Sequence, residues 1–154
     1  MSRNILVPID FSDVTELVLS EACRLARALD AKLWLVHVAT VEPTVVGCEV
    51  GVIYVRDEVA DGLRSQHRKL RQYEVALRDE GLDATAMLVQ GKPTQKILEQ
   101  ADRLDADMIV LGSHGHGAMF HLLAGSVCES LMRKASCPVV VVPSRMAAKG
   151  RAPV

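Results

Sequence analysis

The chain has 154 residues, of which 49% are apolar and only 3% aromatic, and its formal net charge at pH 7 is −1. This length and apolar content suit one domain with an aliphatic core, which we expect over residues 1–144, followed by a basic flexible tail over residues 145–154. The near-neutral charge gives no support to binding of nucleic acid or membrane. Neither a signal-peptide pattern nor an 18-residue apolar run is recognised, so we expect a cytoplasmic protein.

The four cysteines occur singly, without the C-x-x-C spacing of many metal and redox sites. We therefore expect Cys23, Cys48, Cys128 and Cys137 to act as small buried apolar residues rather than as a disulfide or zinc framework.

Short apolar runs alternate with helical patterns, which is typical of a parallel sheet wound by helices. Residues 5–9 form the first predicted strand, in which a proline is tolerable near the end. A helix is predicted over residues 13–28, with Asp13 and Glu16 as a capping box at its start. Residues 33–38 form an unbroken apolar run, as expected of a strand covered on both faces.

The middle of the chain is less regular. Residues 40–54 contain two glycines and a proline without a clear period, so we interpret them as a long loop. A second helix follows and ends near Gly81. Apolar residues mark one face of this helix, opposite a densely charged face: Val59, Leu63, Leu70, Tyr73 and Leu77.

The second half continues the alternation of strands and helices. The predicted elements are a strand over 85–89, a turn at 91–93 into a helix ending near 104, a strand over 108–111, a helix over 126–134 and a strand over 138–142. The expected fold class is therefore α/β: a five-stranded parallel sheet, doubly wound and Rossmann-like, in a three-layer sandwich.

A glycine-rich loop after the fourth predicted strand is the strongest functional signal. It contains Gly112, Gly115 and Gly117, and then Gly125-Ser126 where the next helix begins. Glycines let backbone N–H groups converge on an anion, and a helix N-terminus adds free N–H groups and a positive dipole end. The spacing fits neither the P-loop nor the dinucleotide fingerprint.

A purely structural interpretation of this loop stays open on chemistry alone. Ser126 and Glu129 have the spacing of a capping box, and the glycines are also compatible with a simple turn. Another short match, Gly91-Lys92-x-Thr94, resembles the end of a P-loop but lacks that motif's first glycine.

The motif Gly112-x2-Gly115-x9-Gly125-Ser126 resembles that of the ATP-binding branch of the universal stress protein family at full spacing. The resemblance covers almost the whole chain: the opening strand and turn over 5–12, the second strand over 35–38, the crossover from 91, the strand over 107–112 and the closing strand over 137–142. It implies an adenine nucleotide hydrolase-like fold that binds ATP with Mg or Mn.

The resemblance also implies a set of ligand-binding residues. Asp10 would contact ribose hydroxyls or a phosphate-bound metal ion, although it is also placed to cap the following helix. Val38 would offer its main-chain polar atoms to adenine. The full set of expected nucleotide contacts is Pro8, Ile9, Asp10, Val38, Leu111, Gly112, His114, Gly115, Gly125, Ser126 and Val127.

The expected function is ATP binding in stress response or regulation, with little or no turnover. A slow metal-dependent ATPase and a dimeric scaffold that binds no nucleotide are the alternatives. A zinc site on His114, His116 and His121 is a weaker hypothesis, because no cysteine or acidic pair lies near them. Cys128, just inside a predicted helix, would form a thiolate stabilised by the helix dipole unless it is buried.

The last predicted strand is a run of four valines between prolines, which would be an aggregation hazard as an open edge. By resemblance to the family, Val139–Val142 is expected to pair with its twofold copy in a homodimer.

Overall fold

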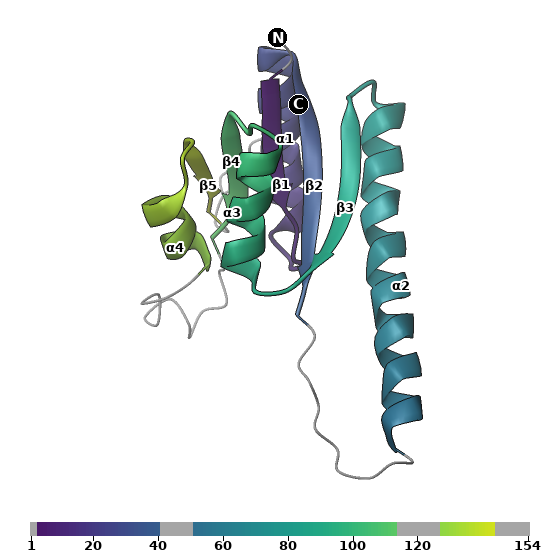
Figure 1. Cartoon of the computed structure of the whole chain (residues 1–154). Helices are drawn as coiled ribbons and strands as arrows, with labels where there is room; N and C mark the ends of the chain where they lie inside the picture. The colour runs from purple at the N-terminus through teal and green to yellow at the C-terminus, as the bar shows by residue number, and fades with distance from the viewer. Residues whose placement is uncertain (1–2, 41–50, 114–126, 144–154) are drawn as a thin grey trace.

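The computed structural model describes residues 3–40, 51–113 and 127–143, and for residues 51–58 only the backbone. Strands and helices alternate along these segments (Figure 1). In chain order the elements are β1 (Arg3–Pro8), α1 (Thr15–Leu29), β2 (Ala31–Ala39), α2 (Gly51–Asp79), β3 (Ala84–Gln90), α3 (Pro93–Arg103), β4 (Met108–Gly112), α4 (Val127–Lys134) and β5 (Val139–Val142). The predicted fold class is confirmed.

All five strands are parallel, in the order β3-β2-β1-β4-β5. The chain therefore builds outward from β1 through β2 to β3, and then returns to the other side of β1 for β4 and β5. This reversal creates a switch point between β1 and β4, where the connections leaving the two strands diverge. In open parallel sheets, ligands bind beyond the strand ends at such a point.

Helices cover both faces of the sheet, as Figure 1 shows with α3 and α4 in front and α1 behind. One core lies between the sheet and the helices α1 and α2, where Val7, Leu35 and Val110 are fully buried. The other lies against α3 and α4, around Leu6 and Ile109. Because strand residues alternate between the two cores, the middle of each strand is mostly apolar, as a doubly covered parallel sheet requires.

The start of α1 differs from its prediction. The helix begins at Thr15 rather than at residue 13, with Val14 as the N-cap, and no side chain caps it. The predicted capping box of Asp13 and Glu16 is therefore wrong. The chain makes a local turn before the helix instead, in which the Ser12 carbonyl accepts a hydrogen bond from the Thr15 N–H at 3.1 Å.

Helix α2 is longer than predicted. It begins at Gly51, so the expected loop over residues 40–54 is wrong for 51–54, while residues 41–50 lie outside the described residues. Figure 1 shows its first turns extending beyond the carboxyl ends of the strands. Leu70 and Leu77 are buried as expected, but Val59 is 37% exposed. Gly81 follows the helix with a φ of +83°, which confirms the predicted stop.

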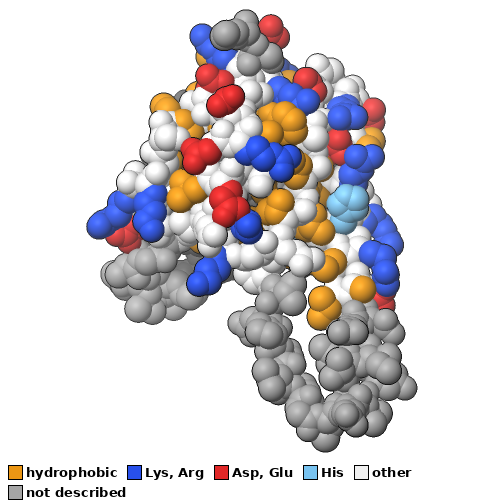
Figure 2. Space-filling view, viewed as in Figure 1, with side chains coloured by type: hydrophobic (Ala, Val, Ile, Leu, Met, Phe, Trp, Pro, Cys, Tyr) orange, Lys and Arg blue, Asp and Glu red, His pale blue; other side chains and the backbone are white. Residues whose placement is uncertain are grey.

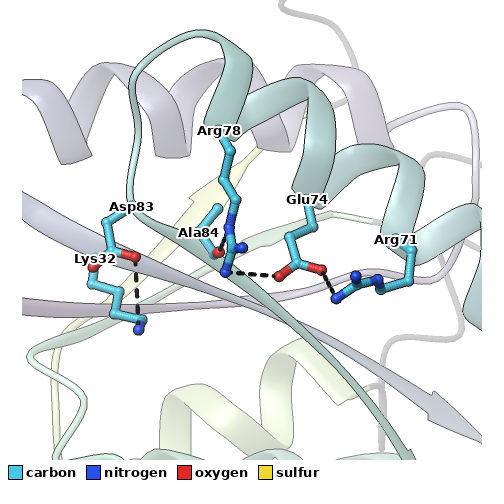
Figure 3. Close-up of polar contacts among 6 residues, drawn as sticks. All are labelled: Lys32, Arg71, Glu74, Arg78, Asp83 and Ala84. Carbon is cyan, nitrogen blue, oxygen red and sulfur yellow. Dashed lines mark hydrogen bonds and ion pairs between the residues drawn. The ribbon is translucent and has the colours of Figure 1, made fainter.

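A buried carboxylate fixes α2 next to β3 (Figure 3). Glu74 is 2% exposed, and each of its oxygens meets one arginine, Arg71 at 2.7 Å and Arg78 at 3.0 Å. Arg78 also donates to the Ala84 carbonyl at 2.7 Å, which ties the helix to the start of β3. The charged face predicted for this helix therefore includes one residue that belongs to the core.

The remaining boundaries agree with prediction to within about two residues. Gly91 adopts a φ of +141° before Lys92 and Pro93 open α3, which confirms the predicted turn. β5 lies at the edge of the described sheet. Its pairing with a second copy stays a prediction, as do the domain limit at 144 and the tail, since residues 144–154 lie outside the described residues.

Acidic and basic side chains are mixed over the face that α3 and α4 cover (Figure 2). Among the described residues, no helix combines the length and the apolar character that crossing a membrane requires.

Candidate functional site

A cavity of about 170 Å³ lies at the carboxyl ends of β1, β2 and β4, at the switch point of the sheet. The starts of α1, α3 and α4 complete the described part of its wall. Seven of the residues singled out from the sequence line it together, although they come from distant parts of the chain: Pro8, Ile9, Asp10, Val38, Leu111, Gly112 and Val127.

The other four expected contacts, His114, Gly115, Gly125 and Ser126, lie outside the described residues. The same is true of His116 and His121, the other two histidines of the zinc hypothesis. Within 3–40, 59–113 and 127–143, no group of three or more His, Cys, Asp or Glu side chains is arranged to hold a metal ion.

The connection between β1 and α1 forms one wall of the cavity. Asp10 is exposed, and its Oδ1 accepts a hydrogen bond from the Ser12 N–H at 3.1 Å. Phe11 adopts a φ of +58°, in the left-handed region that few non-glycine residues enter. The Asp10 carboxylate thus supports the turn before α1, while the first turn of the helix has no side-chain cap.

The aromatic ring of His37 forms a second part of the wall. His37 is 8% exposed, and its Nδ1 lies 2.7 Å from the Ile9 carbonyl oxygen. A carbonyl oxygen only accepts, so Nδ1 must carry the proton and donate. The Phe11 ring packs against the imidazole with the two centroids 4.6 Å apart. These contacts hold His37 in one tautomer and join the ends of β1 and β2 below the cavity.

Thr15, the first residue of α1, carries a buried hydroxyl at this site. Thr15 is 3% exposed and lines the cavity, yet no group in the described part of the chain hydrogen-bonds its Oγ1. A buried polar group left without a partner costs about 1–3 kcal/mol. The sequence of α1 alone does not explain why this cost is retained.

Gly112 at the end of β4 has a packing role. A Cβ at this position would lie 2.9 Å from Val14 Cγ1 and 3.1 Å from Val18 Cγ2, closer than carbon atoms pack. A glycine here lets α1 approach the end of β4. The sequence predicted this glycine for close approach to a ligand, and the described contacts show close approach of a helix.

The start of α4 brings Val127 and Cys128 to the cavity. Burial raises the pKa of the Cys128 thiol above its ordinary value. Of the two alternatives from the sequence, burial rather than a dipole-stabilised thiolate therefore describes Cys128, because desolvation opposes the charged form. Cys23, Cys128 and Cys137 are free thiols, of which only Cys23 is fully buried, and Cys48 lies outside the described residues.

Sequence reasoning missed several residues of the wall, above all Thr15, His37 and Pro93. His37 lies within the predicted strand over residues 33–38, where nothing in the sequence indicates a role at the cavity. Thr15 carried a usable signal, since it precedes the buried residues Leu19, Ala22 and Ala26 at helical spacing, which places a hydroxyl on the core face of α1.

The fold and the cavity together define a doubly wound parallel α/β protein with a ligand crevice at its switch point. The model of the universal stress protein family matches residues 1–143. Universal stress protein YxiE of Bacillus subtilis is 28% identical over 147 residues, covering 92% of this chain and 99% of the relative. A universal stress protein of Thermus aquaticus is 31% identical over 142 residues, with coverage of 92% and 99%. The chain belongs to the universal stress protein family.

Solved structures agree with this assignment. Protein MJ0577 of Methanocaldococcus jannaschii superposes with a TM-score of 0.72 at 28% identity, covering 93% of this chain and 96% of the other. Two structures below 25% identity share the fold. One is a universal stress protein in complex with cAMP, with a TM-score of 0.69, 23% identity and coverage of 92% and 97%. The other is the Archaeoglobus fulgidus protein in complex with dAMP, with a TM-score of 0.58, 24% identity and coverage of 90% and 96%.

Proposed function

We propose that this protein binds an adenine nucleotide, ATP with Mg or Mn, in the cavity at the switch point, and acts as a cytoplasmic stress-response regulator with little or no turnover. The observation that carries the proposal is the cavity itself. Its described wall brings together residues from β1, β2, β4 and α4 that the family resemblance singled out from the sequence. Two proteins of the same fold were solved with cAMP and dAMP, which supports an adenine nucleotide as the ligand class.

The volume of the described cavity suits one part of a nucleotide rather than the whole molecule. Sites for drug-sized ligands occupy about 300–1,000 Å³, so the described cavity of about 170 Å³ suits the nucleoside half better than a whole nucleotide. Val127 opens α4 beside the cavity, and the N–H groups of a helix start attract phosphate. The phosphates would then extend toward α4 and the glycine motif.

Asp10 is the only charged side chain in the described wall of the cavity. Its exposed carboxylate suits either ribose hydroxyls or a hard divalent cation, which prefers oxygen ligands. It would repel a bare phosphate, so binding of a triphosphate should depend on the metal ion. When bound, the metal ion would neutralise phosphate charge. Main-chain atoms of Val38, at the end of β2, would contact the base.

Titration calorimetry with MgATP tests this proposal. We expect measurable binding to the wild-type protein, and loss of at least about tenfold in affinity for Gly125→Glu, because a carboxylate beside the phosphates repels them. Gly62→Glu is the matched control. Gly62 is exposed on α2 and a Cβ there meets nothing within 4 Å, so this variant should bind as the wild type does. A wild-type protein that binds no adenine nucleotide would sink the proposal.

A further inference from the structure

The cavity wall contains a polar group that neither the fold nor the expected phosphate contacts explain. Thr15 Oγ1 is buried and has no hydrogen-bond partner among the described residues, although it stands at the start of a helix, where a hydroxyl often caps a free N–H. Among the described residues no side chain caps the start of α1, so the Thr15 hydroxyl does not bond the N–H groups of that first turn. Within the described residues, the hydroxyl therefore makes no hydrogen bond that would stabilise the fold.

The surroundings of this hydroxyl restrict what it can bind. The described lining that it shares includes the apolar side chains of Val14, Val18 and Val36, has Asp10 as its one charged side chain, and contains no lysine or arginine. Bringing a phosphate into such surroundings would cost far more than one hydroxyl returns. A neutral group that can donate or accept a hydrogen bond fits the position.

His37 also lines the cavity and has a second ring nitrogen. Because its Nδ1 donates to the Ile9 carbonyl, Nε2 of the neutral ring is an acceptor. No hydrogen bond to Nε2 occurs among the residues whose side chains are described. Besides Asp10 and Ser12 at the turn before α1, the described wall thus contains the Thr15 hydroxyl and the His37 ring. A nucleoside carries several neutral donors and acceptors that could pair with them.

We propose that the Thr15 hydroxyl hydrogen-bonds the nucleoside half of the bound nucleotide, which makes Thr15 a specificity-determining residue of this cavity. The inference rests on the proposed function and extends it to a residue that the glycine motif does not contain. Without ligand the hydroxyl lacks a partner, and the ligand supplies one.

Thr15→Val tests this, because valine keeps the branched shape and removes the hydroxyl. We expect the dissociation constants of both MgATP and adenosine to rise by about five- to tenfold, the effect of one hydrogen bond to a buried partner. The same variant without ligand should melt about 2–4 °C higher, since an unpaired buried hydroxyl is gone. Thr15→Ser keeps the hydroxyl and should bind both ligands within about twofold of the wild type.

Gln100→Met is the matched control for removal of a buried unpaired polar atom. Gln100 Oε1 is also buried without a partner, but Gln100 lies on α3 outside the cavity wall. Its substitution should leave both affinities unchanged.

Three results would overturn the inference while wild-type binding of MgATP still supports the proposed function. They are an unchanged affinity in Thr15→Val, a loss confined to MgATP and absent with adenosine, and a lower melting temperature of unliganded Thr15→Val. The last would mean that the hydroxyl stabilises the empty protein.

Discussion

Two buried polar side chains on the same face of the sheet differ in whether the protein supplies them with a partner. Glu74 on α2 is 2% exposed, and each of its oxygens has an arginine partner. Thr15 on α1 is 3% exposed, and its hydroxyl has none. Both side chains pay the desolvation cost of a buried polar group, but only that of Glu74 is offset by partners in the described protein, the two arginines on α2.

The difference follows the location of each residue. Glu74 lies near the amino end of β3, where Arg78 also binds the Ala84 carbonyl and the cluster joins helix to strand. Thr15 lies at the carboxyl ends of the strands, where the sheet forms its cavity. A satisfied polar group stabilises the fold, whereas an unsatisfied one beside a cavity is available to a ligand.

The largest effect is expected from removing the partners of Glu74. In Arg71→Met/Arg78→Met the carboxylate stays buried without a counter-charge, so unfolding free energy should fall by about 3 kcal/mol. For a chain of this size that corresponds to a melting temperature about 6–12 °C lower, measurable by calorimetry or circular dichroism.

The control adds Glu74→Leu to the same variant. Removing the stranded charge should return stability to within about 1 kcal/mol of the wild type, because an apolar side chain fits a buried site. An unchanged stability of Arg71→Met/Arg78→Met would contradict this, because it would mean that the two arginines do not stabilise the buried Glu74 carboxylate. Nucleotide affinity should stay the same in both variants, since these residues do not line the cavity.

A smaller effect is expected where α1 meets β4. Gly112→Ala places a methyl group 2.9 Å from Val14 Cγ1, which should cost about 1–3 kcal/mol of stability. In a Val14→Ala background the cost should shrink, because the atom in the way is gone. Chemical denaturation of the four proteins measures this coupling. Equal costs in both backgrounds would contradict the packing role of Gly112.

The smallest effect concerns the reactivity of Cys128. Because burial raises the pKa of its thiol, less thiolate is present at any pH below that raised value, and alkylation should keep accelerating above the pH at which an exposed cysteine levels off. Bound MgATP should slow iodoacetamide labelling of Cys128, which lines the cavity, but not that of Cys137, which does not. Peptide mass spectrometry across a pH series separates the two sites. Equal protection of both cysteines would argue against a ligand in the cavity.

Much of the fold could be predicted because its signals are local. Apolar runs, helical periods and glycine stops identified five strands and four helices, with Gly81 and Gly91 marking two of the turns. The errors occurred where local signals competed. Asp13 and Glu16 have the spacing of a capping box. The turn before α1 is instead held by hydrogen bonds from the Ser12 N–H to Asp10 Oδ1 and from the Thr15 N–H to the Ser12 carbonyl. The first turn of α2 reads Gly51-Val52-Ile53-Tyr54, a glycine followed by residues that favour strands, so the sequence did not indicate a helix there.

The candidate site could be predicted only in part. The resemblance to the family pointed to Pro8, Asp10 and Gly112, and the structure places them around one cavity. Neither His37 nor Thr15 was found, because the role of each depends on partners far away in sequence or on the absence of any partner.

By itself, the sequence determined the order of the elements, the parallel doubly wound sheet and the family, since these depend on patterns that neighbouring residues carry. Only the tertiary structure decided that Glu74 is buried with two arginines, that Gly112 makes room for α1, and that Thr15 faces the cavity without a partner. Burial and hydrogen-bond pairing are properties of a side chain's surroundings. Segments far apart in the chain supply those surroundings only when it folds.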